Sequence, residues 1–252
     1  MKFKTLFMKK PLKIILIALG IITGLIVILA SVYLIYFTSM KKEMKITESG
    51  EIVSGIYAVK DSYVNMYIIR TGSGYIAIDA AIDKARVKTE LDKLQIDPAQ
   101  VLAIFLTHTD ADHVGSIELF KNARVYISKD EEQFVNGKTS RFLVFGNRLP
   151  CKYELLDDNA VIYFDSLHVK AITTHGHTSG SMSYLVNGKY LFTGDCLSLK
   201  SGKADIFSTF INMDNIADKA SIKKLKTISG AGYIFTAHHG YSNNFKEVFS
   251  NW

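Results

Sequence analysis

The chain has 252 residues, 48% of them hydrophobic, and a formal net charge of +6 at pH 7. This length allows one domain of about 200 residues and an additional segment. Residues 1–45 hold eight lysines and one glutamate, a net of +7, whereas residues 46–252 hold 22 basic and 23 acidic residues, a net of −1. The basic balance therefore belongs to the N-terminal segment, and the rest of the chain shows no clear nucleic-acid-binding surface.

The N-terminal segment contains an uncharged, apolar run from Ile14 to Phe37. The run is longer than the roughly 20 residues that a helix needs to cross a bilayer. Lysines outnumber acidic residues more strongly before the run than after it, which places the N-terminus in the cytoplasm. The run is also too long, and lacks the closing cleavage site, for a signal peptide.

We therefore predict a single-pass protein of the cell membrane that contacts the lipid bilayer through this helix. Residues 1–45 would form the basic cytoplasmic tail, the transmembrane helix and a connector. Residues 46–252 would form an extracellular domain.

The remaining chain alternates between strand and helix patterns. Strands are predicted over residues 51–59, 63–70, 75–79, 101–106, 124–127, 160–164, 168–173, 181–186, 189–192 and 233–236. Helices are predicted over residues 83–94, 129–134, 214–228 and 244–252, with another beginning near residues 116–120. Hairpins mixed with alternating helices and strands predict an α/β layered domain.

A polar turn follows the apolar strand at residues 101–106. It holds His108, Asp110, Asp112 and His113 within six residues. The carboxyl ends of strands are where open α/β sheets place their ligands. Imidazole and carboxylate groups are ligands of zinc, iron and manganese, so this turn is predicted to bind metal.

Further candidate ligands follow other predicted strands. They are His175 and His177 in a Gly-rich turn, Asp195 in a Gly-Asp pair, and the adjacent His238 and His239. Six of the seven histidines thus lie in three turns at strand ends. This clustering predicts one metal centre assembled from several strand ends.

The motifs occur in the order H-x-D-x-D-H, G-H-T-x-G, G-D and a late H-H-G turn. Over roughly residues 46–252 this order resembles the metallo-β-lactamase-fold hydrolase superfamily. The resemblance implies an αββα four-layer sandwich, with the metals at one edge between two sheets. It also implies a metal-dependent hydrolase.

Carried over by position, the resemblance assigns two metal sites. His108, Asp110 and His177 would bind the first metal, and Asp112, His113 and His239 would bind the second, with Asp195 bridging them. His239 is assigned because Gly240 follows it, and His238 remains the alternate. His175, where the family often has proline, is interpreted as a supporting or surface residue.

Asp110 departs from the family pattern, which has histidine at this position. The variant resembles the metallo-hydrolase domain of membrane competence proteins that import DNA, and its extra carboxylate also resembles flavodiiron oxidoreductases. A carboxylate is a harder ligand than imidazole and favours iron or manganese. Two divalent metal ions are therefore expected, with zinc first and iron or manganese as alternatives.

Two close divalent ions would lower the pKa of a bridging water and make hydroxide available. The metal-bridging hydroxide would attack an ester, amide, thioester or phosphoester, and Asp112 would orient the nucleophile or take its proton as the catalytic residue. Asp79, Thr107 and Thr178 are expected to fix the orientation of the ligands. The prediction is a membrane-anchored binuclear hydrolase of a small-molecule substrate.

Two other functions fit the same ligands. A metal-binding oxidoreductase partner of flavodiiron type would need a flavin-binding domain on a separate protein, because this chain has no room for one. A catalytically silent metal-binding surface module is disfavoured by the intact Asp195.

The segments 135–150 and 197–213 are expected to form the pocket walls. Their sequence does not predict their conformation, so it does not identify the substrate. Residues 137–150 are either a lid or an irregular core connection, with the second favoured. Cys151 and Cys196 could pair outside the cytoplasm, and two free or buried cysteines are the favoured expectation.

Overall fold

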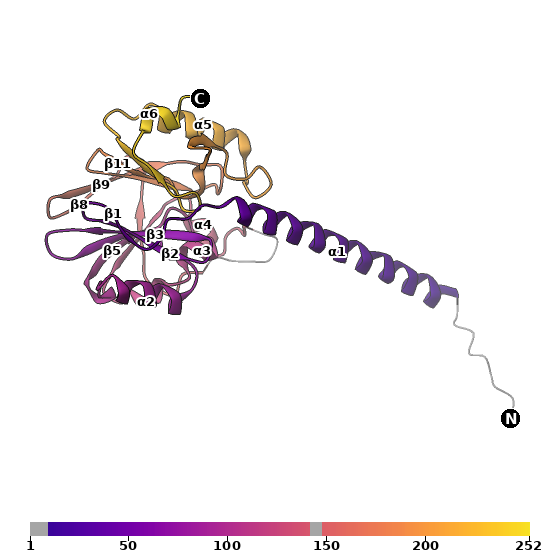
Figure 1. Cartoon of the computed structure of the whole chain (residues 1–252). Coiled ribbons are helices and arrows are strands. Elements are labelled where there is room, and N and C mark those ends of the chain that lie inside the picture. The colour runs from indigo at the N-terminus through magenta and orange to yellow at the C-terminus, as the bar shows by residue number, and fades with distance from the viewer. Residues whose placement is uncertain (1–9, 142–147) are drawn as a thin grey trace. The chain divides into compact units, whose positions relative to one another are not determined.

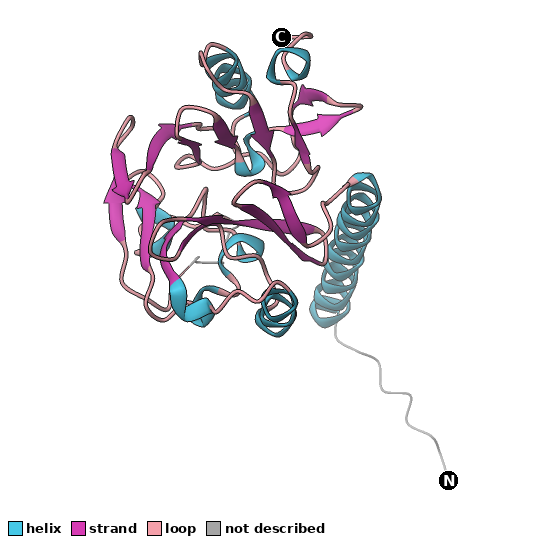
Figure 2. Cartoon of the chain, turned by 60° about the vertical axis from the view of Figure 1, so that its left-hand side comes forward, coloured by secondary structure: helices cyan, strands magenta, loops and turns pink. Residues whose placement is uncertain are grey.

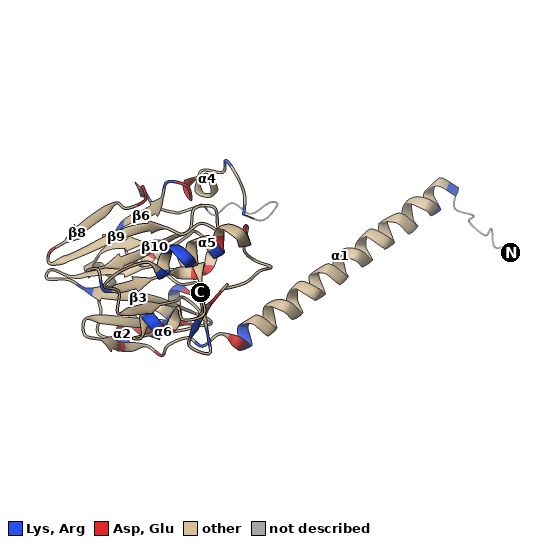
Figure 3. Cartoon of the chain, turned by 90° about the horizontal axis from the view of Figure 1, so that it is seen from above, with Lys and Arg blue, Asp and Glu red and all other residues tan. Residues whose placement is uncertain are grey.

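The computed structural model describes residues 10–141 and 148–252, and the chain divides into two compact units, Met1–Met44 and Lys45–Trp252. The first contains helix α1 (Lys10–Glu43), which covers the predicted span and extends beyond both of its ends. By length and composition α1 can cross a membrane. Its charged residues lie only near its two ends (Figure 3).

The first sheet of the second unit has seven strands in sequence order. They are β1 (Gly50–Val53), β2 (Ile56–Asp61), β3 (Val64–Arg70), β4 (Tyr75–Ile78), β5 (Val101–Phe105), β6 (Arg124–Ser128) and β7 (Glu154–Leu156). Strands β1 to β4 pair antiparallel, and β4 to β7 pair parallel. The strand predicted over residues 51–59 is in fact two strands, because the chain turns at Gly55, whose φ is +76°. The short strand β7 had no recognisable sequence pattern.

The second sheet has six strands in the order β15-β14-β11-β10-β9-β8. They are β8 (Val161–Phe164), β9 (Leu167–Thr173), β10 (Met182–Val186), β11 (Tyr190–Phe192), β14 (Tyr233–Phe235) and β15 (Tyr241–Ser242). Only β11 and β14 pair parallel. A separate two-stranded sheet, β12 (Ser198–Lys200) with β13 (Lys203–Asp205), was not predicted.

The two large sheets pack face to face, with helices on their outer faces (Figures 1 and 2). Aromatic side chains such as Phe105 and Tyr184 fill the core between the sheets. Helix α2 (Lys84–Lys93) and helix α5 (Asn215–Lys226) bury apolar residues in the two outer cores. The predicted αββα four-layer sandwich is confirmed. The remaining α-helices are α3 (Ala111–Val114), α4 (Glu132–Val135) and α6 (Phe245–Val248).

Hydrogen bonds between the sheets hold the strand ends together at one edge. The Tyr184 hydroxyl on β10 donates to the carbonyl of Leu106 at 2.7 Å, and the Tyr67 hydroxyl on β3 donates to that of Thr236 at 2.7 Å. Both acceptors lie just before a turn that carries histidines. Since these bonds are buried, loss of either partner would leave an unsatisfied polar group, and the turns are therefore held firmly.

Candidate metal centre

The turn after β5 brings four predicted ligands into one small volume. Helix α3 begins at Ala111, earlier than predicted, with Asp110 at its N-cap. His108 and Asp110 therefore lie in the loop, whereas Asp112 and His113 lie on the helix. This change of backbone direction allows the four side chains to serve two neighbouring groups.

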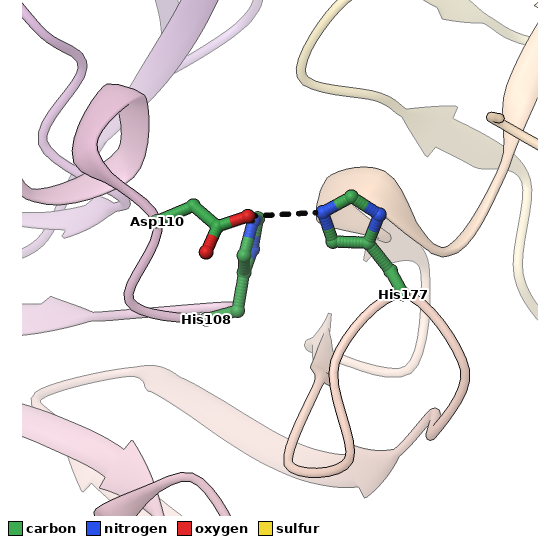
Figure 4. Close-up of side chains that lie close together, drawn as sticks. All are labelled: His108, Asp110 and His177. Carbon is green, nitrogen blue, oxygen red and sulfur yellow. Dashed lines mark ion pairs between the residues drawn. The ribbon is translucent and has the colours of Figure 1, made fainter. Parts of the chain in front are cut away.

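The first ligand group consists of His108, Asp110 and His177, which point toward one another from two loops (Figure 4). The distance from His108 Nε2 to Asp110 Oδ2 is 3.6 Å, and that from His177 Nε2 to the same oxygen is 3.4 Å. Both histidines are buried. His177 lies between β9 and β10, so the group spans both sheets.

The second ligand group consists of Asp112, His113 and His238. His238 Nε2 lies 3.5 Å from Asp112 Oδ2 and 3.2 Å from Asp195 Oδ1. Asp195 Oδ1 is 3.6 Å from His113 Nε2, and Asp195 Oδ2 is 3.5 Å from His177 Nε2. Asp195, which follows β11, therefore lies between the two groups.

His238 occupies the place that sequence reasoning assigned to His239. The His238 Nδ1–H donates to the carbonyl of Tyr63 at 2.6 Å, and its ring stacks on that of Tyr63. His239 lies outside all the metal-ligating groups of the described residues. Gly240, on which the choice of His239 rested, has a φ of +70° that serves the turn into β15.

Three of the histidines are oriented through their Nδ1 atoms. His113 Nδ1 lies 2.9 Å from Asp79 Oδ2, and His177 Nδ1 lies 2.9 Å from Asn212 Oδ1. With the Tyr63 carbonyl beside His238, each partner is an acceptor, so each Nδ1 carries the proton and each Nε2 presents a lone pair. Asp79 was expected from the sequence, and Asn212 was not.

The lone pairs at the centre suit a divalent cation. Among the described residues of the two ligand groups and Asp195, four buried atoms have no hydrogen-bond partner: His108 Nε2, His113 Nε2, His238 Nε2 and Asp195 Oδ1. Unpartnered buried polar atoms are rare and costly. Imidazole nitrogens facing carboxylate oxygens are satisfied by a metal ion between them, so the donor set fits a divalent metal.

The charges of the centre reinforce one another. Burial raises the pKa of the Asp195 carboxyl, but His238 and His113 outweigh burial and hold that pKa well below its usual range. Burial lowers the pKa of His113, but Asp79, Asp195 and Asp112 outweigh it and raise that pKa well above its usual value. Without a cation, the ionised carboxylates therefore favour a second proton on His113, and a divalent ion at Nε2 would take the place of that proton.

Glu131, which sequence reasoning missed, joins the two ligand-bearing loops. Its Oε1 accepts from the Thr109 backbone N–H at 2.8 Å and hydroxyl at 2.7 Å, and its Oε2 accepts from the Thr178 hydroxyl at 2.6 Å. Thr178 was expected to orient a ligand directly, and it instead acts through this carboxyl. Burial raises the pKa of Glu131. Nothing in the sequence near Glu131 marks it, because its partners lie on distant segments.

Arg141 enters the centre from the stretch whose function the sequence left open. Its Nε donates to Asp110 Oδ1 at 3.0 Å and Oδ2 at 2.9 Å, and its Nη2 donates to His177 Nε2 at 3.1 Å. The sequence favoured an irregular core connection over residues 137–150, and this interpretation did not predict the contact of Arg141 with the ligands. Residues 142–147 lie outside the described residues.

Phe207 covers the histidines from the second segment that was expected to supply pocket walls. Its ring stacks on His238 with a centroid distance of 5.0 Å and meets His177 edge-on at 5.6 Å. Phe207 is buried. It therefore screens part of the centre from water. His175, by contrast, is half-buried and pairs with Asp130 at the surface.

An αββα sandwich with histidines and aspartates converging at its strand ends is the architecture of a metal-binding hydrolase fold. The chain belongs to the metallo-β-lactamase superfamily, whose family profile matches residues 59–238. It is 28% identical to the hydroxyacylglutathione hydrolase of Glaesserella parasuis serovar 5, over 77% of this chain and 72% of that protein. It is 31% identical to the probable polyketide biosynthesis zinc-dependent hydrolase PksB of Bacillus subtilis, over 48% of each chain.

Solved structures share the same fold. A B3 metallo-β-lactamase with an active-site glutamic acid superposes with a TM-score of 0.65 at 20% identity, over 84% of this chain and 89% of that one. The metallo-β-lactamase of Cronobacter sakazakii with a HARLDQ motif gives 0.62 at 22% identity, over 79% and 81%. The predicted family and its class of metal-dependent hydrolases are confirmed.

We expect replacement of Asp218 by asparagine to stabilise the protein at neutral pH. Asp218 Oδ2 accepts from Asn212 Nδ2 at 3.0 Å, and burial raises the pKa of this fully buried carboxyl to about 7. The unfolded chain ionises it near 3.8. The folded state therefore binds the extra proton between these values, and the free energy of unfolding falls as pH rises from about 4 to about 7.

Asparagine keeps the acceptor and carries no charge. Asp218→Asn should gain up to about 4 kcal/mol over the natural protein at pH 7.5, and little at pH 4. Urea unfolding of both full chains in detergent at the two pH values measures the difference. Asp92→Asn, at an exposed position on α2, is the control. A gain that does not depend on pH would contradict the assignment.

Proposed function

We propose that the chain is a membrane-anchored, metal-dependent hydrolase whose centre is built from the two ligand groups and Asp195. The observation that carries the proposal is the convergence of unpartnered Nε2 and Oδ1 atoms, presented by histidines whose Nδ1 atoms are held by acceptors. Such an arrangement costs free energy unless a cation completes it. Membership of the superfamily supports the same conclusion.

The residues that would hold metal are those of the two ligand groups, with Asp195 between them. A bound divalent ion supplies Lewis acidity and lowers the pKa of water at the centre. Zinc is the first choice because two relatives are named as zinc-dependent, and the extra carboxylate keeps iron and manganese as alternatives. The number of ions depends on Arg141, which contacts the first ligand group.

Asp112 is the carboxylate best placed to exchange a proton with substrate. Its side chain is 20% exposed, compared with 5% for Asp195. His238 Nε2 lies 3.5 Å from Asp112 Oδ2, so the Asp112 carboxylate faces the centre as well as solvent. We therefore assign Asp112 to orient the nucleophile or accept its proton, as a residue with access to both solvent and the centre.

The substrate is proposed to be a small molecule with an acyl thioester or related ester bond. Several relatives of this chain are named hydroxyacylglutathione hydrolases, and the matches span about 70% of their length. The full chain in detergent would be loaded with Zn²⁺, Fe²⁺ or Mn²⁺ and assayed against a hydroxyacylglutathione, a lactone, a lactam and a phosphodiester. Turnover that a chelator removes and metal restores is the expected result.

Each other outcome of this experiment contradicts the proposal. A chain that binds none of the three metals has no metal centre. A chain that binds metal but turns over no substrate is the silent module. A chain whose bound iron cycles between oxidation states with an added flavoprotein, without hydrolysis, is the flavodiiron-type partner.

We further propose that α1 anchors the protein with its N-terminus in the cytoplasm and its metal centre outside. Cys151 is exposed and Cys196 is buried, and both are free. A membrane-impermeant maleimide should therefore label the full chain on intact cells through Cys151. Cys151→Ser should abolish the labelling. Labelling only after the cells are permeabilised would overturn the orientation.

A further inference from the structure

The two ligand groups differ in what already contacts their donor atoms. In the second ligand group, His113 Nε2 and His238 Nε2 have no hydrogen-bond partner within the described part of the chain, and neither does the adjacent Asp195 Oδ1. In the first ligand group, Arg141 contacts both oxygens of Asp110 and Nε2 of His177. The lone pairs that a first metal would need are therefore used by a guanidinium.

The guanidinium is held in place by geometry and charge. The Arg141 side chain is 1% exposed, and arginine stays protonated in proteins. Because Asn212 accepts from His177 Nδ1, Nε2 of His177 carries a lone pair and accepts from Arg141 Nη2. Two cations cannot share these acceptors without strong repulsion in a buried site.

The balance of charge also favours Arg141 at the first ligand group and one divalent ion at the second. The single carboxylate of the first ligand group is matched by the single positive charge of Arg141. Among the described residues, the carboxylates of Asp79, Asp112 and Asp195 form ion pairs with histidines only, and of these only Asp112 and Asp195 face Nε2 atoms. Two carboxylates without a lysine or arginine partner match the charge of one divalent ion.

His108 remains available to the metal ion at the second ligand group. Its Nε2 has no hydrogen-bond partner within the described residues, and it also lies in a group with His113 and Asp195. Arg141 therefore occupies the first ligand group at Asp110 and His177, while the remaining donors face the second ligand group.

We propose that Arg141 is a built-in cation that replaces the first metal, so that the chain binds one divalent ion tightly, at the second ligand group and Asp195. This inference rests on the proposed hydrolase function and lowers the number of bound metal ions from the two expected from the sequence to one. Arg141 then supplies fixed positive charge where a first metal would stand. A preorganised cation at that place stabilises negative charge that develops on a substrate.

The test is the number of metal ions per chain. The full chain in detergent is dialysed against Zn²⁺ buffered at a free concentration that saturates tight sites, and bound zinc is measured by elemental analysis. The natural protein should hold one ion. Arg141→Met removes the charge at similar length and should raise the number to two, whereas Arg141→Lys should keep it at one. Arg148→Met, at an exposed position beyond the same stretch, is the matched control and should hold one.

A second variant tests the proposal independently of how Arg141→Met folds. His238→Ala should bind no zinc, because the second ligand group is broken and Arg141 blocks the first. Two tight ions in the natural protein, or one retained in His238→Ala, would overturn the proposal while leaving the hydrolase function intact. If neither the natural protein nor Arg141→Met binds zinc, the metal centre itself is refuted.

Discussion

Replacing Asp195 with alanine will release the metal and abolish hydrolysis. Asp195 Oδ1 faces His113 Nε2 and His238 Nε2, and Oδ2 faces His177 Nε2. Among the described residues, no other carboxylate has a recorded ion pair with all three of these histidines. Loss of metal removes several kcal/mol of transition-state stabilisation, so turnover should fall at least about 1,000-fold.

Elemental analysis and chelator competition on the full chain measure the metal, and the substrate panel measures turnover. Asp92→Ala, which removes an exposed carboxylate from α2, is the matched control and should leave both unchanged. If Asp195→Ala binds zinc as tightly as the natural protein, Asp195 is not a ligand. Unfolding curves separate this result from a loss of fold.

Asp79→Asn should weaken metal binding by about 10- to 100-fold, the usual effect of losing a partner that orients a ligand. Asp79 Oδ1 accepts from the Thr107 backbone N–H at 2.7 Å, and Oδ2 lies 2.9 Å from His113 Nδ1. Asparagine tolerates the φ of +62° at this position. Its oxygen would keep the bond to Thr107 and turn its NH₂ group toward His113.

An NH₂ group beside Nδ1 forces that nitrogen to accept. The His113 proton then moves to Nε2, where it faces Asp195 and blocks the lone pair that a metal needs. Competition with a chromophoric chelator measures the zinc affinity of the full chain, and Asp92→Asn serves as the control. Unchanged affinity in Asp79→Asn would show that the His113–Asp79 contact does not orient a ligand.

Much of the centre was visible in the sequence because its residues follow recognisable strands. The apolar run before His108 predicts the strand that ends at Phe105, and the short apolar stretch before Asp195 predicts β11. A strand pattern predicts where a chain leaves a sheet, and the carboxyl ends of strands are where sites form. The ligand-bearing turns could therefore be named without coordinates.

Residues that act across the fold were not visible in this way. Glu131 joins loops 22 and 47 positions away in sequence, and Asn212 orients a histidine 35 positions before it. Neither lies in a motif, since each serves only through tertiary contacts. The short strands β7, β12, β13 and β15 were missed because two or three residues that include polar or charged ones show no period, whereas the equally short β11 and β14 are wholly apolar.

The sequence by itself determined the family, the αββα sandwich, the apolar N-terminal helix and the turns that hold the ligands. The helix and the turns follow from local hydrophobic patterns and from residue types at short spacing, whereas the family and its αββα sandwich follow from the resemblance of the ordered motifs. Only the tertiary structure decided that His238, and not His239, faces Asp112, and that Arg141 lies between Asp110 and His177. Both depend on where a side chain points once distant segments pack together. The spacing of residues in the sequence does not determine that orientation.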